Sequence, residues 1–386
     1  MDSRDLFPVP PSPFTWSLFQ EGWRLGRGGV AEDLAVETPE AVWVLRDGRV
    51  ESAPGWGEGL ARALYHASPL AARLLGGARI VPRSRGWRRF LSRPRDPWDG
   101  VRERSQRTVQ RLRRWARDVE GLSWTQADVL QVMEEIGPHM GMGVCAWTEV
   151  TVALADALAA STEEAVPRAL SQVREVRGLV RALDEAARSS GDGAAEVIRV
   201  YPWLAPLPLE AASPRWAEIP DILARRLSAI PAGGGTTPAG DRSPLSEWLE
   251  RRERLRSALA QVVSAARTWV RVVAREAMED GRFRSPEEAF FLTLEELKQV
   301  VTGEWSRPER VRPLVDERRR QGPEPSVWWE TWPELREDGV VVAEGWHPGW
   351  VPAALGRSGL ATRAHSPVSY GHVLAAVLGI RVEALA

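Results

Sequence analysis

Three arginines on one helix face are the first residues in this sequence whose type and spacing suggest chemistry. Arg267, Arg271 and Arg275 follow one another at four-residue steps, so their guanidinium groups lie on the same side of a helix. Guanidinium groups suit phosphate and carboxylate, and one interpretation is a stripe that holds an anionic ligand. The alternative is a solvated face neutralised by Glu276, Glu279 or a neighbouring helix. The residues alone leave both interpretations open.

A single glutamate in an apolar segment is the second candidate. Residues 139–160 are nearly apolar throughout, and a helix that is apolar on all sides is buried in the centre of a bundle. A carboxylate placed there must be ion-paired, protonated or directed into a cavity. Glu149 is therefore the candidate acid of a pocket, with a paired core glutamate as the alternative.

Tryptophan is unusually frequent in this chain. The sequence contains 19 Trp against 3 Tyr and 7 Phe, which is more than a globular core requires. One interpretation is ordinary packing of a large helical protein. The other is an aromatic-lined pocket for a bulky apolar or cationic ligand, with Trp147, Trp269 and Trp350 as candidate ligand-binding residues.

Composition argues against several classes of function. The 51 basic and 52 acidic residues of the 386-residue chain nearly balance, so we expect neither a nucleic-acid nor a membrane partner. Cys145 is the one cysteine, which fits a reducing cytoplasm, and we expect no secretion signal and no membrane span. The five histidines lack metal-ligand spacing and no glycine-rich phosphate loop occurs, so we expect no metal and no cofactor.

Hydrophobic periodicity predicts the elements that position these side chains. Apolar residues recur at three- and four-residue steps from Trp248 to Met278, which predicts a long helix stopped by Gly281. Two capping boxes are predicted next, at Ser285–Glu288 and at Thr293–Glu296. We expect Gly137–Pro138 to interrupt the helical pattern that surrounds it.

Strand signals occur only near the two ends of the chain. Ala41 to Val50 reads as a hairpin around an Asp-Gly turn. Gly339–Glu344 and Leu360–Thr362 read as short strands, and Ser369 to Gly379 reads as a helix. The sequence therefore predicts a mainly α protein, a multi-helix bundle with a small N-terminal β-hairpin and a reduced C-terminal α/β unit.

The same patterns suggest a division into three parts. Residues 1–100 form an N-terminal segment with the hairpin and short helices. Residues 101–325 form the helical domain, which contains a flexible Gly/Pro-rich linker at 231–244. Residues 326–386 form a small C-terminal domain.

Three phrases give the chain a resemblance to a known family. They are SPEEAFFLTLEEL at Ser285–Leu297, PSPFTWSL at Pro11–Leu18 and SPRWAEIP at Ser213–Pro220. Together they resemble the phosphoenolpyruvate-utilising phosphotransferases, which include phosphoenolpyruvate synthase, pyruvate phosphate dikinase and rifampicin phosphotransferase. The resemblance implies that the chain corresponds to the part downstream of the ATP-binding domain. It also implies that an apolar loop, Trp203–Glu210, replaces a polar loop of the family's reaction site.

The C-terminal residues resemble a truncated phosphohistidine swivelling domain. In that domain a histidine carries the phosphoryl group, and the resemblance places Tyr370 at the carrier position. A phenol with an ordinary pKa near 10 is a poor substitute for a carrier imidazole. His365 is the nearby residue that could serve instead, since His372 lies about 200° around the helix from Tyr370. The resemblance thus implies a reduced remnant that has lost phosphotransfer, with Tyr370 and His365 as candidate site residues.

We hypothesise that the protein binds or converts an apolar organic small molecule in a Trp-rich helical pocket, without phosphotransfer. One alternative is a phosphotransferase subunit that acts with a separate ATP-binding-domain protein and carries phosphate on His365 or His372. Another is a non-catalytic binding or scaffold protein. The last is a cyclase or isomerase without metal, in which tryptophans stabilise a carbocation and a buried carboxylate such as Glu149 acts as acid. The sequence does not decide whether the protein is an enzyme.

Overall fold

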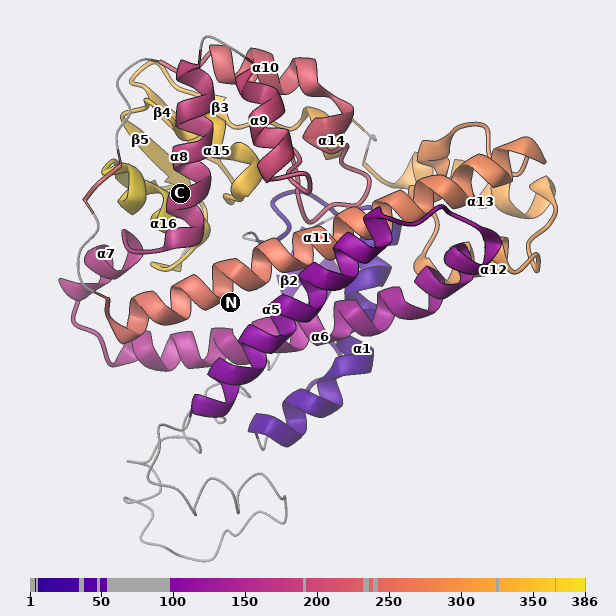
Figure 1. Ribbon diagram of the computed structural model, residues 1–386, viewed down its shortest axis with the longest axis horizontal. Helices are drawn as coiled ribbons and strands as arrows, with labels where there is room; N and C mark the ends of the chain where they lie inside the picture. The colour runs from indigo at the N-terminus through magenta and orange to yellow at the C-terminus, as the bar shows by residue number, and fades with distance from the viewer. Residues whose placement is uncertain are drawn as a thin grey trace, which may run out of the picture.

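Four long helices form the body of the protein, as the computed structural model in Figure 1 shows. The structure describes residues 4, 6–34, 38–46, 49–53, 98–189, 192–231, 236–238, 242–323, 326–364 and 366–385. The long helices are α1 (Pro13–Leu34), α5 (Asp99–Glu120), α6 (Gln126–Ala159) and α11 (Pro244–Glu279). Helix α6 packs against the other three, and α11 also packs against α5. The prediction of a mainly helical bundle is confirmed.

Helix α11 is the predicted long helix, and it begins a few residues earlier than its apolar pattern. Ser243 caps it by accepting a hydrogen bond from the Ser246 amide at 3.1 Å, and Pro244 occupies the first turn. Its end follows the prediction, because Gly281 adopts a φ of +79°, a left-handed conformation that favours glycine. Almost every side of α11 between Leu245 and Ala277 is buried.

Helix α6 corrects one expectation. It continues through Gly137 and Pro138 for 34 residues, so the predicted interruption is wrong. The physical reason is close packing against α1. A Cβ on Gly137 would meet Leu25 at 3.2 Å, and one on Gly141 would meet the carbonyl oxygen of Gly22 at 3.1 Å. Pro138 itself points to solvent, and the tertiary contacts of the flanking turns offset its missing hydrogen bond.

Helix α6 is also long and apolar enough to cross a membrane by length and composition, the only such helix among the described residues. The expectation of no membrane span stays a prediction. About 56% of its most apolar window is buried inside the protein, against α1, α5 and α11. The core helix of a soluble protein passes the same test.

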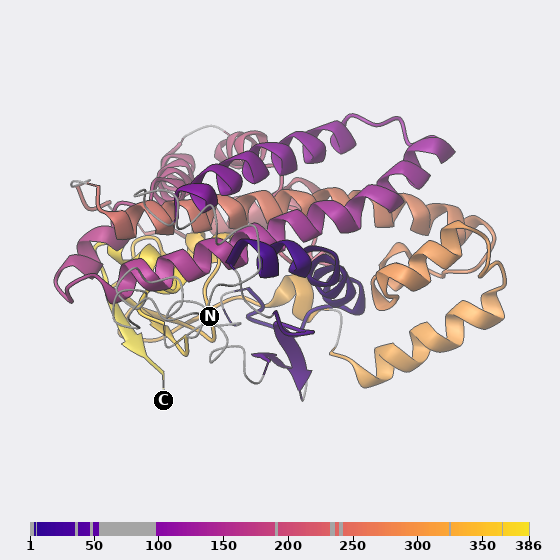
Figure 2. The same cartoon turned by 90° about the horizontal axis from the view of Figure 1, so that it is seen from below.

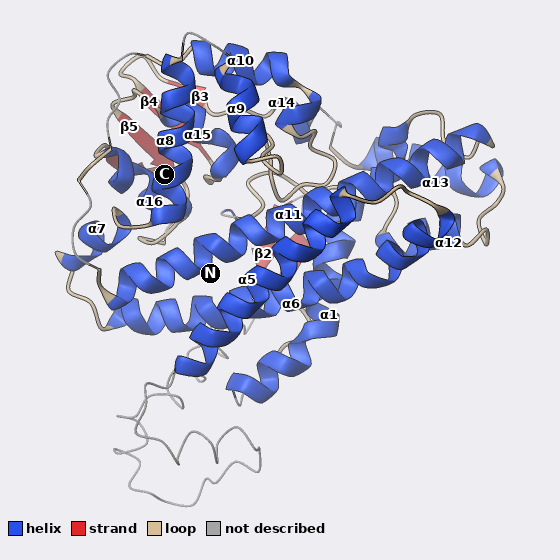
Figure 3. Cartoon of the chain, in the orientation of Figure 1, coloured by secondary structure: helices blue, strands red, loops and turns tan. Residues whose placement is uncertain are grey.

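Two small sheets lie at separate places, coloured red in Figure 3. Strands β1 (Trp43–Arg46) and β2 (Arg49–Ser52) pair antiparallel, with Trp43 opposite Ser52, which confirms the hairpin. Its Asp-Gly turn lies outside the described residues. In Figure 2 this hairpin projects below the long helices. Trp43 packs edge-on against Phe7 and Phe19, forming one of the Trp-rich aromatic clusters of the core.

The C-terminal sheet has the strand order β3-β4-β5-β6. Strands β4 (Val340–Ala343), β5 (Gly359–Thr362) and β6 (Arg381–Ala384) are parallel, while β3 (Glu334–Leu335) pairs antiparallel with β4. Helix α15 (Val351–Ala354) lies in the connection from β4 to β5, and α16 (Tyr370–Leu378) connects β5 to β6. The two predicted strands and the predicted helix of this region are confirmed.

Shorter helices complete the fold. Near the C-terminal sheet lie α7, α8, α9 and α10, while α12 and α13 lie at the opposite end of α11 (Figure 1). One continuous hydrophobic core joins residues of all three predicted parts of the chain. The bounds are α7 Ala165–Leu170, α8 Arg174–Arg188, α9 Gly193–Val200, η2 Trp216–Glu218, α10 Pro220–Ser228, η3 Pro286–Phe291, α12 Leu294–Val301, α13 Pro308–Gln321, α14 Val327–Glu330 and η4 Pro348–Trp350.

The two predicted capping boxes differ in outcome. Thr293 and Glu296 form the expected reciprocal pair at the start of α12. Ser285 precedes the turn η3, but its side chain makes no capping hydrogen bond, and that prediction is wrong. The carboxylate of Glu288 instead accepts the amide of Arg284 at 2.8 Å. A 3-10 turn brings different groups together than the α-helical turn that the pattern assumes.

Replacing Pro138 by alanine tests the account of α6. The substitution restores a backbone donor at an exposed position, so we expect the free energy of unfolding to rise by about 2 kcal/mol. The matched control is Pro244→Ala, at the first turn of α11, where proline is already compatible with the helix, and it should give no gain. Urea unfolding followed by circular dichroism measures both. A Pro138→Ala protein no more stable than the parent would contradict this account.

Candidate functional site

The arginine stripe of α11 is largely ion-paired inside the protein. Arg267 is buried and donates to both carboxylate oxygens of Glu218, at 2.8 and 2.9 Å. It also donates to the carbonyl oxygens of Ala211 and Ala212. Arg271 pairs with the same Glu218, whereas Arg275 is exposed. The stripe is thus divided, with two arginines held by the turn η2 and one in solvent.

Glu218 has a strongly shifted acidity. Burial by itself would raise its pKa, but the hydrogen bonds and charge of Arg267, helped by Arg271, outweigh that effect and lower the pKa to about 2. Neighbouring Arg215 is fully buried, and burial together with the charge of Arg267 lowers its pKa to about 9. The cluster is a structural ion-pair network that fixes η2 on α11.

Glu149 is paired in the helical core. Its carboxylate accepts two hydrogen bonds from Arg104 of α5, at 3.1 and 3.2 Å. Trp147 packs against Trp43 with ring centroids 6.5 Å apart, and the indole of Trp269 donates to the carbonyl oxygen of Val129 at 3.0 Å. The predicted site residues Glu149, Trp147 and Trp269 do not line the pocket described below.

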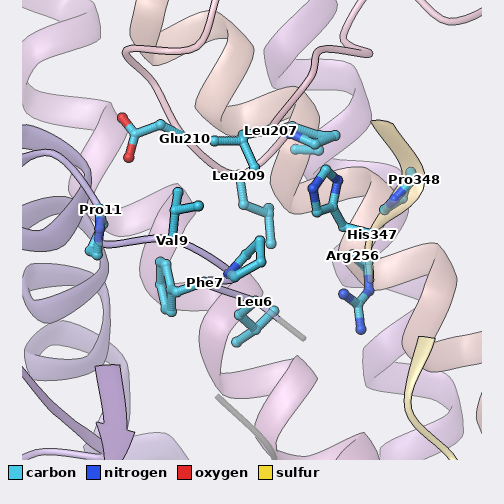
Figure 4. Close-up of a pocket in the computed structure, with 13 residues that line it drawn as sticks. Leu6, Phe7, Val9, Pro11, Leu207, Leu209, Glu210, Arg256, His347 and Pro348 are labelled. Atoms are coloured by element: carbon cyan, nitrogen blue, oxygen red, sulfur yellow. The ribbon is translucent and has the colours of Figure 1, made fainter. Parts of the chain in front are cut away.

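A mainly apolar pocket lies between segments that are far apart in the sequence (Figure 4). Its walls are residues of the N-terminal segment 6–11, the loop 207–210, Arg256 and Ala260 of α11, and His347 with Pro348. The space not filled by atoms is about 410 Å³, a value that includes the open mouth. Most of that volume is open mouth rather than enclosed space, so a ligand bound here would be small and partly exposed to solvent.

Glu210 anchors two walls of this pocket rather than facing its interior. Its carboxylate accepts hydrogen bonds from the Ser12 amide and hydroxyl, from the Thr15 hydroxyl and from the Ala212 amide, at 2.6 to 2.9 Å. In Figure 4 the carboxylate points away from the other labelled side chains. Burial raises the pKa of Glu210. These bonds join the segment before α1 to the apolar loop that contains Leu209.

His347 is a lining residue whose ring has an unsatisfied nitrogen. It caps the turn η4, where its Nδ1 accepts the amide N–H of Gly349 at 3.2 Å. An amide can only donate, so Nδ1 carries no proton and the proton of the neutral ring lies on Nε2. Burial first, and then the charge of Arg256, hold the pKa of His347 well below its ordinary value. Within the described part of the chain, buried Nε2 has no hydrogen-bond partner.

The backbone around Gly349 explains why His347 keeps this orientation. A Cβ on Gly349 would lie 2.0 Å from the carbonyl oxygen of Ala205 and 2.5 Å from that of Pro206, so glycine is required. The ring of Trp350 lies 4.1 Å from the imidazole and packs on it. The loop that lines the pocket therefore also fixes the turn that orients its histidine.

The remaining predicted site residues have different surroundings. Tyr370 is buried at the start of α16, with the guanidinium of Arg256 5.2 Å from its ring centre. Trp350 contacts His347 as described above. His365 lies outside the described residues. In the described segments no group of three or more His, Cys, Asp or Glu side chains is placed to hold a metal ion.

Sequence reasoning missed the residues that form the pocket. His347, Arg256 and Glu210 were not among the candidates, because His347 and Glu210 lie in mainly apolar phrases and Arg256 ends the charged run ERRERLR at 250–256, which reads as a solvated face. The available signal was a histidine between two tryptophans, Trp346 and Trp350, where a lone polar residue must find a buried role. No protein-family model and no curated protein sequence matches this chain.

Replacing Glu218 by glutamine tests the ion-pair network. We expect the free energy of unfolding at pH 7 to fall by about 2 kcal/mol, because buried Arg267 loses its counter-charge while Glu218 is partly exposed. The folded pKa of about 2 lies below the ordinary 4.5, so the stabilisation is complete above pH 4.5 and disappears as the pH falls through 2.

The difference between Glu218→Gln and the parent protein should therefore shrink steadily between pH 4.5 and pH 2. Glu163→Gln is the matched control, since Glu163 is exposed and forms no ion pair with the described residues. Denaturant titrations at several pH values measure both variants. A difference that stays constant with pH would count against the assigned pairing.

Proposed function

We propose that this protein binds a small, mainly apolar organic molecule that carries a hydrogen-bond acceptor, in the pocket formed by segment 6–11, loop 207–210 and His347. The observation that carries the proposal is the buried Nε2–H of His347, which has no partner among the described residues. A buried donor without a partner costs about 1–3 kcal/mol. A bound carbonyl, hydroxyl or carboxylate oxygen removes that cost.

The other walls of the pocket favour an apolar body for this ligand. Leu6, Phe7, Val9, Leu207 and Leu209 offer carbon surface, which contributes about 25 cal/mol for each Å² of apolar area removed from water. The imidazole is neutral at pH 7, so it orients an acceptor without demanding a full negative charge. The arrangement supports binding rather than acid–base turnover, because the Glu210 carboxylate is directed away and already accepts four hydrogen bonds.

We further propose that the chain descends from the helical and phosphohistidine parts of a phosphoenolpyruvate-synthase-like enzyme and has lost phosphotransfer. The resemblance of its three phrases supports this origin. The surroundings of Tyr370 support the loss, since a carrier group must reach separate active sites and Tyr370 is 1% exposed beneath Arg256. The four-stranded C-terminal sheet is, on this proposal, a reduced carrier domain fixed against the helices.

Benzamide and toluene provide a matched pair of probes for the pocket. Both have an aromatic ring of similar size, but only benzamide offers a carbonyl acceptor to His347. We expect benzamide to raise the melting temperature and to bind more tightly than toluene. His347→Asn keeps an acceptor for the Gly349 amide but removes the Nε2–H, so benzamide affinity should fall about 3- to 10-fold.

His372→Asn is the control for this experiment. His372 makes a similar local contact, with Nδ1 2.8 Å from the Ser369 hydroxyl, but it does not line the pocket. The benzamide affinity of the His372→Asn protein should equal that of the parent protein. Equal benzamide binding by the parent and by His347→Asn, or equal binding of benzamide and toluene, would refute the proposed role of His347.

A further inference from the structure

Arg215 is a buried arginine that does not line the pocket beside His347. It precedes the turn η2, where its backbone amide donates to the Glu218 carboxylate at 3.1 Å, and it is 4% exposed. The guanidinium makes one long hydrogen bond, from Nη1 to the carbonyl oxygen of Glu210 at 3.4 Å. Its Nε and Nη2 are buried and have no hydrogen-bond partner in the residues that the structure describes. Unsatisfied donors on a buried charged group are costly, so something is expected to complete them.

The two unsatisfied nitrogens form one edge of the Arg215 guanidinium, and elsewhere in the protein this edge holds a negative charge. Arg267 donates from Nε and Nη2 to the two carboxylate oxygens of Glu218, at 2.8 and 2.9 Å. Arg24 donates from the same two nitrogens to Glu21, at 2.6 and 2.7 Å. The edge presents two parallel N–H groups, a geometry that suits an anion.

The charges around Arg215 do not balance. Glu218 is shared by Arg267 and Arg271. The Glu210 carboxylate accepts its four hydrogen bonds from uncharged groups. Burial, and then the charge of Arg267, lower the pKa of Arg215 to about 9, so the guanidinium stays charged at pH 7. A water molecule would satisfy the two N–H groups and leave this charge unpaired, whereas an anion would supply both the acceptor and the counter-charge.

We propose that the Nε–Nη2 edge of Arg215 binds one small monovalent anion, such as chloride. Both N–H groups donate to the ion, and the charge of the ion balances the guanidinium. A small ion is favoured over an organic acid, because Arg215 is enclosed by the protein. The anion that the sequence suggested for the arginine stripe is thus assigned to a neighbouring arginine. This inference does not depend on the ligand proposed for the pocket beside His347.

Thermal unfolding of the full chain in sodium chloride and in sodium gluconate, at equal concentrations, tests this proposal. Gluconate is a bulky anion that an enclosed site excludes. We expect a melting temperature about 3 °C higher in chloride, the shift for a ligand at about 100 times its dissociation constant. Arg215→Met removes the cation and keeps a long apolar side chain, so it should abolish the difference. Arg275→Met, at the exposed arginine of the stripe, should retain it.

Bromide provides a second measurement that does not require a variant to fold. Crystals of the parent protein grown in sodium bromide should show an anomalous-scattering peak within hydrogen-bonding distance of Nε and Nη2 of Arg215. Three results would each overturn the proposal. They are equal melting temperatures of the parent in the two salts, a chloride effect that persists in Arg215→Met, and bromide peaks confined to the protein surface.

Discussion

The burial of α11 on almost all sides is the constraint on which the rest of the structure depends. A helix enclosed in this way cannot leave its charged side chains to water, so each charge requires a counter-charge inside the protein. Glu253 lies between Arg252 and Arg256 for this reason, and Arg267 is held by Glu218. The Glu253 pairs lie within α11, whereas Arg267 ties α11 to η2 and to the loop before it. They also place polar groups where the C-terminal sheet meets the helical body.

A histidine that packs near α11 has an unsatisfied donor, and it identifies the candidate site. The Nε2–H of His347 has no hydrogen-bond partner in the described segments, although the residue is buried. His347 lines the pocket formed by segment 6–11 and loop 207–210. A folded protein tolerates an unsatisfied polar group chiefly where something else completes it. The pocket thus suggests a ligand that offers an acceptor to this nitrogen.

The elements of this fold could be predicted from local patterns, whereas the pockets could not. The apolar periodicity of residues 248–278 and the stop at Gly281 predicted helix α11. Pro138 led to the wrong prediction of an interrupted helix, because close packing of α1 against glycines of α6 outweighs the usual effect of proline. That packing joins segments far apart in the sequence, so no local pattern shows it. The pocket could not be predicted for the same reason, since its walls come from segments far apart in the sequence. The proton position on His347 depends on the amide of Gly349, and Gly349 is held by a loop about 140 residues earlier in the chain.

The protonation of His347 is the property that tests the account most directly. Nitrogen-15 NMR of the histidine side chains in the full chain, with His347→Asn used for assignment, reports which ring nitrogen carries the proton. We predict a neutral imidazole protonated on Nε2 at pH 7, which remains neutral at pH 5.5. An imidazolium at pH 5.5, or a proton on Nδ1, would contradict a buried donor held ready for a ligand.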